Sequence, residues 1–416
     1  MAHFIYSNGR LMAEQVPLAD IAATHGTPCY VYSRAAIEQH WHAYDQAFKG
    51  RGHLVCYSVK ANGNLAVLNV LARLGSGFDI VSVGELERVL LAGGDAAKVV
   101  FSGVGKQDHE VRRALMAGIR CFNVESISEL HHLDRIAGEL NSRAPVALRV
   151  NPDIDPGTHP YIATGLNRSK FGIPYEQALD TYRLAQTLGN IEITGIDCHI
   201  GSQITQLSPY LDALKKLAAL CHTLKSAGTP LRHIDVGGGM GISYRDEKTF
   251  AAPEFVHAVC SELADPDLEI LIEPGRSIAG EAGVLLTRVL YLKGTPARNF
   301  AITDAAMNDL LRPALYDAWQ RVLPLREQGS GSPQRYDLVG PVCESADFLA
   351  LDRELDIVEG DLLALGSAGA YGFCMSSNYN ARPRAAEVMV DREGFFQVRR
   401  RETIADLVSG ESLLPR

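Results

Sequence analysis

Short apolar runs alternate with segments of helical periodicity through the middle of the chain. The apolar runs lie at residues 55–59, 78–81, 99–101, 121–124, 146–150, 196–200, 233–236 and 270–272. The amphipathic segments between them include residues 65–74, 85–92, 111–117, 127–140, 178–188 and 211–224. This alternation predicts a parallel sheet covered by helices. Eight strands over about 250 residues match a (β/α)₈ barrel, although an open doubly wound sheet has the same periodicity.

Polar residues or glycines end every one of these apolar runs. They are Lys60, Asp79 with Ser82, Ser102, Glu125, Arg149 with Asn151, His199, the glycines at 237–239, and Glu273. Taken singly, each of them is most simply a cap that meets solvent. In a barrel, however, the C-terminal ends of all the strands point to one face, where catalytic residues collect. As a set, these residues favour the barrel and an active site at its mouth.

The pattern changes after about residue 282, where Gly and Pro turns separate short strands. We expect strands at residues 284–291, 300–303, 335–342, 362–364, 386–390 and 395–399. This spacing is typical of an antiparallel sandwich or small barrel. The Gly- and Ser-rich segment 328–333 is expected to be a flexible loop.

The N-terminal segment is expected to contribute to both parts of the molecule. A β element near residues 4–6 and a helix entered near Pro17 precede a strand at 29–32 and a helix at 33–48, for which Ser33 is the predicted N-cap. A chain of 416 residues is too long for one ordinary core. We therefore predict a barrel over residues 29–281 and a β domain formed by 1–28 plus 282–416, which the first strand joins.

Composition narrows the class of protein. Hydrophobic residues make up 46% and charged residues 21% of the chain, as in globular proteins. A net charge of −9 with dispersed Lys and Arg disfavours nucleic acid or an anionic membrane as a partner. Neither a membrane-length apolar run nor a secretory signal is apparent. The eight cysteines contain no C-x-x-C pair, which predicts reduced thiols, a cytoplasmic location and no metal site.

Lys60 and the glycine run suggest the chemistry. A strand-end lysine usually reaches water, but a desolvated one can act as an amine nucleophile and form a Schiff base. Glycines 237–239 form either a tight turn or a backbone cradle for phosphate, a frequent feature after the seventh and eighth strands of this barrel. A dinucleotide loop is disfavoured because the run lies far from an opening βαβ unit. Together with His199 and Glu273, these groups match the requirements of pyridoxal phosphate.

Several motifs resemble a known family. The motifs Tyr-Ser-Val-Lys-Ala-Asn at 57–62, His-Ile-Gly-Ser-Gln at 199–203 and Glu-Pro-Gly-Arg at 273–276 resemble those of alanine-racemase-fold (type III) pyridoxal-phosphate decarboxylases. The motifs Arg-Pro-Ala-Leu-Tyr at 312–316, Cys-Glu-Ser-Ala-Asp at 343–347 and Ala-Tyr-Gly at 370–372 are similar to those of the diaminopimelate decarboxylases. The resemblance covers essentially the whole chain in the right order.

The resemblance implies a role for each motif residue. Lys60 would bind pyridoxal 5′-phosphate, with His199 stacked on its ring, Glu273 on the ring nitrogen and Asp79 in support. Phosphate contacts would come from Ser202, Gly239, Gly275 and Arg276. Substrate contacts would come from Arg276, Arg312, Tyr316, Glu344 and Tyr371, the last also touching the cofactor. Cys343 would donate a proton to the product carbon, and a homodimer would share active sites through the Cys343–Glu344 loop and Tyr371.

The substrate implied is meso-diaminopimelate, which would yield L-lysine. Arg312 can bind its distal carboxylate in a bidentate manner, and Glu344 can accept from its distal ammonium. A decarboxylase of ornithine, arginine or carboxynorspermidine, a racemase with a tyrosine base, and a non-catalytic cofactor-binding protein are the alternatives. Taken one at a time, Cys343 could be a buried loop thiol, Arg312 a partner of Asp309, and Tyr371 a packing ring.

Overall fold

The computed structural model describes residues 3–159, 162, 164–166, 169–327 and 331–416. It divides into two compact units. We name Glu38–Ser243 with Glu247–Ile278 the barrel unit, and Met1–Ile37 with Tyr244–Asp246 and Ala279–Arg416 the β unit. The loop expected at 328–333 lies partly outside the described residues. No helix in the described part of the chain is long and apolar enough to cross a bilayer.

The barrel unit is built on a closed ring of parallel strands. In ring order, these are β5 (His53–Ser58), β6 (Gly77–Ile80), β7 (Val99–Phe101), β8 (Cys121–Val124), β9 (Ala144–Asn151), β11 (Ile191–Asp197), β12 (His233–Asp235) and β13 (Glu269–Ile272). The ring closes where β13 pairs with β5, so that Leu271 lies opposite Leu54. A two-residue strand, β10 (Ile173–Pro174), pairs with the end of β9. The predicted barrel is therefore confirmed, and the open sheet is excluded.

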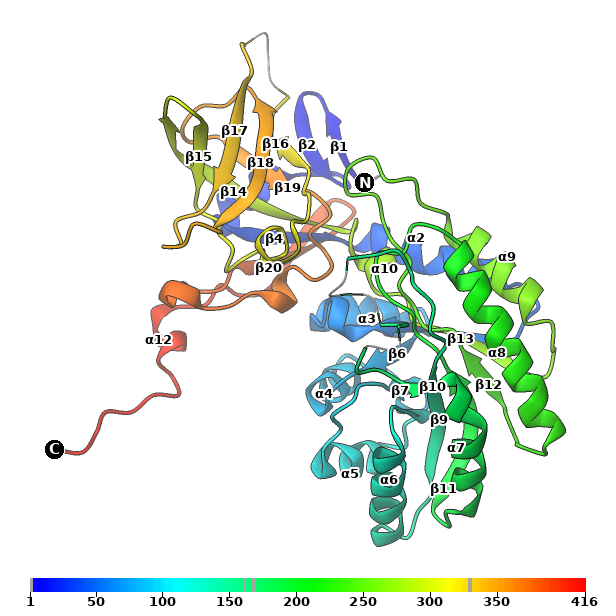
Figure 1. Cartoon of the computed structure of the whole chain (residues 1–416). Coiled ribbons are helices and arrows are strands. Elements are labelled where there is room, and N and C mark those ends of the chain that lie inside the picture. Colours follow the sequence, from blue (N-terminus) through cyan, green and yellow to red (C-terminus); the bar gives the residue numbers. More distant parts are fainter. Residues whose placement is uncertain (1–2, 160–161, 163, 167–168, 328–330) are drawn as a thin grey trace. The chain divides into compact units, whose positions relative to one another are not determined.

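Helices lie outside the strands of the ring (Figure 1). They are α3 (Leu65–Arg73), α4 (Val83–Leu91), α5 (Asp108–Ala117), α6 (Ile127–Glu139), α7 (Tyr175–Thr187), α8 (Ser208–Ser226) and α9 (Ala252–Glu262). The helices α4, α5, α7 and α8 begin two or three residues earlier than the apolar pattern predicts. Polar side chains cap the first turns of α4 and α5. In α4, for example, Ser82 accepts a hydrogen bond from Glu85 N. The predicted cap at Ser33 is confirmed, since its hydroxyl accepts from Ala36 N (3.1 Å) at the start of α2 (Arg34–Asp45).

Buried side chains from several strands of the ring pack against one another. Leu54, Cys56, Val100, Cys121, Ala147 and Leu271 form one buried cluster. Burial raises the pKa values of the Cys56 and Cys121 thiols well above the usual range for cysteine, so both thiols stay protonated. They are core residues, as the apolar strands predict.

The β unit has a mixed, mostly antiparallel sheet. Its strands are β4 (Cys29–Ser33), β14 (Gly283–Gly294), β15 (Asn299–Thr303), β16 (Val322–Pro324), β17 (Gln334–Val339), β18 (Phe348–Leu355), β19 (Leu362–Leu365), β20 (Ala386–Asp391) and β21 (Gly394–Arg399). The main path runs β18-β17-β15-β14-β4-β20-β21. Only β15–β17 and β20–β4 pair in parallel among the described strands of this sheet. The predicted second, mostly antiparallel domain is confirmed.

The strand at 29–32 does not belong to the barrel, where the sequence placed it. Val31 of β4 lies opposite Val284 of β14 on one side and Val388 of β20 on the other. All residues of β4 are buried. A central strand buried on both faces has the same continuous apolar pattern as a barrel strand, so the pattern alone could not assign it.

The N-terminal strands form a separate small sheet, β1 (Phe4–Ser7), β2 (Arg10–Ala13) and β3 (Val16–Pro17). Their buried side chains, including Phe4 and Leu11, belong to the same hydrophobic core as Val31 and Val388. The N-terminal segment thus joins the β unit through its core. A short helix, α1 (Leu18–His25), begins directly after Pro17, as predicted.

Candidate active site

Lys60 lies on a single 3₁₀ turn, Val59–Ala61, that follows β5. Its ammonium group contacts the carboxylate of Asp79, which is fully buried, while the lysine side chain keeps 34% of its surface exposed. Ser58 lies opposite Asp79 in the strand pairing, and its hydroxyl donates to Asp79 Oδ2 (2.8 Å). The predicted pair Lys60 and Asp79 is therefore brought together at the end of two neighbouring strands, with the amine still reachable from outside.

Glu273 follows β13 and is only 4% exposed. Its Oε1 is at the limit of hydrogen-bond distance from Ser102 Oγ (3.5 Å) and Asn123 Nδ2 (3.4 Å). Burial raises the pKa of Glu273 well above its usual range, and the nearby acids Asp235, Asp79 and Asp197 raise it further, while Lys60 opposes them. A buried carboxyl group with a raised pKa keeps its proton near neutral pH unless a cation lies beside it.

Two further buried acids lie beside Glu273. Asp197 and Asp235 end β11 and β12 and are opposite one another in register. One carboxyl oxygen from each of Asp197, Asp235 and Glu273 lies within 4.8 Å of the others. Burial raises the pKa of Asp235 to about 7. Neither aspartate was predicted as a site residue from the sequence, because both lie inside apolar runs that were interpreted as core strands.

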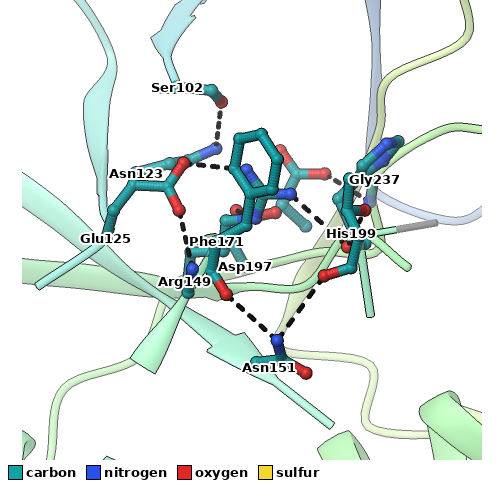
Figure 2. A network of polar contacts seen from close by, with 12 residues as sticks. Ser102, Asn123, Glu125, Arg149, Asn151, Phe171, Asp197, His199 and Gly237 are labelled. Carbon is teal, nitrogen blue, oxygen red and sulfur yellow. Dashed lines mark hydrogen bonds and ion pairs between the residues drawn. The ribbon is translucent and has the colours of Figure 1, made fainter. Parts of the chain in front are cut away.

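Glu125 follows β8 and pairs with Arg149 of β9 (Figure 2). Its Oε1 accepts from Arg149 Nη1 (2.8 Å) and Gly103 N (3.1 Å), and its Oε2 accepts from Gly172 N (2.8 Å). The Arg149 guanidinium in turn lies over the ring of Phe171, 4.8 Å from its centroid. These strand-end residues, predicted as part of the mouth, bind one another and fix its shape.

His199 and the glycine run are in direct contact. His199 Nδ1 accepts from Gly238 N (3.1 Å). Burial, with Arg149 and Lys60 nearby, lowers the pKa of His199 well below its usual range, so its ring is neutral. A Cβ on Gly238 would lie 1.9 Å from Glu273 O, and Gly239, at φ +100°, would place one 2.0 Å from Gly201 O. Only glycine permits this close packing of three strand ends.

Ser202, Gly239, Gly275 and Arg276 gather around the same point. Arg276 Nη2 donates to Ser202 Oγ (3.0 Å), and Gly239 packs on the residue before Ser202. Gly275 packs on Ser58 and Ala61, next to Lys60. A guanidinium, a hydroxyl and glycine backbone groups are the usual elements of a phosphate site.

In the β unit, Arg312 and Tyr316 share the short helix α11 (Arg312–Tyr316). Arg312 is 6% exposed, and its guanidinium lies over the ring of Tyr244, 4.4 Å from the centroid. Stacking on an aromatic face leaves the edge of a guanidinium available for planar hydrogen bonding. A helix and a stacked ring thus hold the side chain for which a carboxylate-binding role was predicted.

Cys343 and Glu344 lie on an exposed loop of the β unit. Cys343 N donates to Asn380 Oδ1 (2.9 Å), and Tyr379 OH donates to Glu344 Oε2 (2.8 Å). Tyr379 and Asn380 come from one 3₁₀ turn, Tyr379–Ala381. The start of the loop is anchored at Asp347, which accepts from Val342 N (2.7 Å) and Met307 N (2.7 Å).

Comparisons with known proteins place this chain among enzymes. A family model described as "Pyridoxal-dependent decarboxylase, pyridoxal binding domain" matches residues 34–280. The diaminopimelate decarboxylase of Vibrio cholerae is 60% identical over 417 residues, covering all of both chains. That of Pseudomonas aeruginosa is 59% identical over 416 residues, again with full coverage. This chain belongs to the diaminopimelate decarboxylase family of pyridoxal-dependent decarboxylases.

A solved member of the diaminopimelate decarboxylase family has the same fold. The crystal structure of the Helicobacter pylori enzyme, complexed with L-lysine, superposes with a TM-score of 0.91 at 42% identity, covering 94% of this chain and 98% of that one. The family resemblance inferred from the motifs is thereby confirmed. Pyridoxal phosphate is the cofactor of this family, as the description of its model states.

The barrel residues of this decarboxylase-family chain fit pyridoxal phosphate. A partly exposed lysine amine lies next to the buried acids, and the glycine-lined cradle beside Arg276 and Ser202 is of the kind that a phosphate requires. The ring nitrogen needs an acidic partner, and the buried Glu273 is a residue of that kind. The cofactor residues predicted from the sequence thus all lie in the barrel unit except Tyr371, which lies in the β unit. Their roles stay predictions.

Tyr379 and Asn380 were not predicted from the sequence of this decarboxylase-family chain as residues near the site. They contact the predicted pair Cys343 and Glu344 from a turn more than thirty residues later in the chain. Hydrophobic periodicity carries no information about exposed loops. The feature that could have identified them is the Tyr-Asn pair itself, which follows Tyr371 in the sequence and has two side chains able to form hydrogen bonds.

Proposed function

We propose that this chain decarboxylates meso-diaminopimelate to L-lysine and carbon dioxide, the last step of lysine biosynthesis. The observation that carries the proposal is 60% identity over the whole chain to a diaminopimelate decarboxylase. The geometry agrees, because a lysine, a buried acid and a phosphate cradle meet in the barrel unit while a buried arginine and an exposed thiol lie in the β unit.

In the barrel unit, this chain's residues hold the cofactor and control one proton. When bound, pyridoxal phosphate supplies an electron sink for the C–C bond that breaks. Lys60 would hold it through its amine, with Asp79 as the counter-ion, and the neutral imidazole of His199 would lie against its ring. Glu273 would keep a proton on the ring nitrogen. Ser202, Gly239, Gly275 and Arg276 would hold the phosphate.

In the β unit, Arg312, Tyr316, Glu344 and Tyr371 select the substrate, with Arg276 of the barrel unit. Arg312 is prepositioned by Tyr244 to bind the distal carboxylate through two parallel hydrogen bonds. Glu344 accepts from the distal ammonium, and the hydroxyl of Tyr379 orients its carboxylate. A shorter amino acid such as ornithine has no distal carboxylate, so it would lack this contact with Arg312.

Cys343 donates the proton that replaces the lost carboxyl group. The thiol is exposed, and its own backbone is held by Asn380. A thiol that acts as a general acid has to be protonated when it reacts, in contrast to a nucleophilic thiolate. Proton transfer from Cys343 forms the C–H bond at the substrate carbon that has lost carbon dioxide.

The working form is a homodimer in the cytoplasm. Cys343 and Glu344 are solvent-exposed in the single chain, which suits a loop that enters the active site of a second copy together with Tyr371. All eight cysteines are free thiols, as expected for a reducing compartment. Sedimentation at working concentration tests the dimer, and a monomer with full activity would contradict it.

The decisive experiment measures carbon dioxide release from a panel of amino acids. The purified chain is supplied with pyridoxal phosphate and offered meso-diaminopimelate, lysine, ornithine, arginine and carboxynorspermidine. We expect release from meso-diaminopimelate, with L-lysine as the product. Faster release from any other member would replace this substrate, and racemisation without gas release would identify a racemase. No turnover of any member by protein that binds the cofactor would favour a non-catalytic role.

A further inference from the structure

Tyr210 is a buried tyrosine that the proposed mechanism does not use. It lies in the first turn of α8 and is 3% exposed. Its ring packs edge-on against Phe255, with 4.9 Å between the ring centroids, and its hydroxyl donates to Gly238 O (2.9 Å). A buried tyrosine hydroxyl needs a hydrogen-bond partner, and here that partner is a carbonyl group of the glycine run. A helix outside the ring of strands is thereby connected to the candidate phosphate cradle.

The first peptide group of the glycine run is hydrogen bonded at both of its ends. A trans peptide group is planar, so its C=O and its N–H point in opposite directions. Gly237 O accepts from Glu273 N (2.8 Å), and at the other end of the same group Gly238 N donates to His199 Nδ1 (3.1 Å). Both hydrogen-bonding groups of this peptide are therefore used within the barrel unit.

The next peptide group, between Gly238 and Gly239, is hydrogen bonded at one end only. Its carbonyl oxygen accepts from Tyr210, whereas Gly239 N has no acceptor among the residues that the structure describes. Because Tyr210 comes from α8, the N–H at the opposite end points away from that helix. Gly239 is half-buried and packs on the residue before Ser202, whose hydroxyl accepts from Arg276. An amide N–H without an acceptor, next to a hydroxyl and a guanidinium, is a donor suited to an anion.

The hydrogen bond from Tyr210 matters because peptide groups between glycines rotate easily. Gly239 has φ +100°, a conformation that glycine adopts far more readily than other residues. Neither Gly238 nor Gly239 has a side chain that would fix the peptide group between them. A half-turn of this group would place the carbonyl oxygen of Gly238 where the N–H had been, and a carbonyl oxygen repels a phosphate that an N–H would bind. The hydroxyl of Tyr210 opposes this rotation.

We propose that Tyr210 is a positioning residue for the phosphate of the cofactor. Its hydroxyl holds the peptide group between Gly238 and Gly239 in the orientation that directs Gly239 N–H at the phosphate. This inference rests on the proposed function, because the phosphate contact of Gly239 is part of it. Tyr210 acts through Gly238, so its role depends on the hydroxyl group and not on the aromatic ring.

The first test compares two ligands of the full chain freed of cofactor: pyridoxal phosphate and pyridoxal, which lacks the phosphate. Tyr210→Phe keeps the ring and removes the hydroxyl. The Kd for pyridoxal phosphate should rise about 10- to 100-fold, the range for a hydrogen bond to a charged group, while the Kd for pyridoxal should not change. Tyr182→Phe is the matched control, because Tyr182 of α7 is also buried and its hydroxyl donates to another glycine carbonyl, Gly195 O (2.8 Å).

The control variant should bind both ligands as the unmodified protein does. Equal weakening of both ligands in Tyr210→Phe would show a general effect on the site and would overturn the proposal. Unchanged binding of both ligands in Tyr210→Phe, or the same selective loss in Tyr182→Phe, would overturn it as well.

The second test begins with the unmodified protein and does not require activity. In crystals of the holoenzyme, Gly239 N should lie within about 3.2 Å of a phosphate oxygen, with Gly238 O still accepting from Tyr210. In Tyr210→Phe crystals this distance should lengthen or the peptide group should be rotated. A holoenzyme without the contact from Gly239 N, or a variant with an unchanged contact, would contradict the proposal. Failure to decarboxylate meso-diaminopimelate would alter neither test, so the two proposals fail separately.

Discussion

The acids at the barrel strand ends and the Cys343–Glu344 loop of the β unit are held in opposite ways. In the barrel unit, Asp79 and Glu273 are buried at strand ends, and register with neighbouring strands sets their positions. In the β unit, Cys343 and Glu344 are exposed on a loop. Cys343 N donates to Asn380 and Glu344 accepts from Tyr379, and these two hydrogen bonds hold the loop. The difference teaches that the cofactor side of the site is fixed by one chain's core. The exposed loop, by contrast, is suited to meeting a second surface, as the proposed dimer requires.

Lys60→Ala should have the largest effect, because it should abolish cofactor binding in the barrel unit. Without an amine next to Asp79, the protein should lose the visible absorbance of bound pyridoxal phosphate, and decarboxylation should fall by at least about 10³-fold. Absorption spectra after incubation with the cofactor and gel filtration provide the measurement. Lys98→Ala is the matched control, because Lys98 is a half-buried lysine that precedes β7 and donates to Gly75 O (3.0 Å). An unchanged band in Lys60→Ala would remove Lys60 from its role.

Cys343→Ala should lower turnover without changing cofactor binding in the barrel unit. The barrel unit is untouched, so cofactor absorbance should be the same as in the unmodified protein. Loss of the proton donor should lower kcat by about 10²- to 10⁴-fold. Cys374→Ala, which removes the other exposed thiol of the β unit, is the control and should keep full activity. Steady-state kinetics that show a full-speed Cys343→Ala variant would eliminate the thiol as the donor.

Asp309→Asn tests whether a buried acid of the β unit also carries a proton. Burial raises the pKa of Asp309 to about 7, so the folded state binds a proton that the unfolded chain releases above about pH 4. The stability from this group is complete below pH 4, falls as the pH rises, and is lost above pH 7. Asn cannot ionise, and its oxygen can still accept from Ala306 N as Asp309 does (3.0 Å).

The free energy of unfolding of Asp309→Asn should therefore exceed that of the unmodified protein at pH 8 by about 1–3 kcal/mol. The gain should be smaller at pH 5. Urea unfolding at both pH values is the measurement, and Asp212→Asn, at an exposed aspartate of α8, is the control. Equal effects of Asp309→Asn at pH 5 and pH 8 would show that Asp309 does not titrate between them.

Tyr379→Phe should have the smallest effect, because it removes one exposed hydrogen bond to Glu344. We expect KM for meso-diaminopimelate to rise about 2- to 10-fold with little change in kcat. Tyr291→Phe, at an exposed tyrosine on β14, should leave both constants unchanged. A KM that does not move in Tyr379→Phe would show that this tyrosine does not orient Glu344.

Much of the barrel could be predicted from the sequence, because its signal is local. The strands 99–101 and 121–124 were predicted with the bounds that the structure has, and the other barrel strands within a few residues. Lys60 lies on a turn after β5, not at the end of the strand as expected, because a 3₁₀ turn can continue an apolar run. The gathering of Lys60, Asp79 and Glu273 followed from the geometry of barrel strand ends alone.

The rest depended on information that periodicity does not contain. Strand β18 was missed, because Asp352 takes a left-handed conformation inside it (φ +54°) and charged residues interrupt the alternation. Asp235 was assigned to packing, since nothing in an apolar strand marks a residue whose carboxyl group faces Glu273. The roles of Arg312, Cys343 and Tyr371 came from the resemblance and stay predictions.

The position of β4 has a consequence for how the chain matures. This strand lies near the N-terminus, yet its neighbours on both sides, β14 and β20, are synthesised roughly 250 and 350 residues later. The ring of the barrel unit, by contrast, is continuous between residues 53 and 272. On the ribosome the ring can close before β4 has a partner strand. The central sheet of the β unit can form only when almost the whole chain has emerged. A truncation before β20 would therefore leave β4 with one edge unpaired and prone to aggregation.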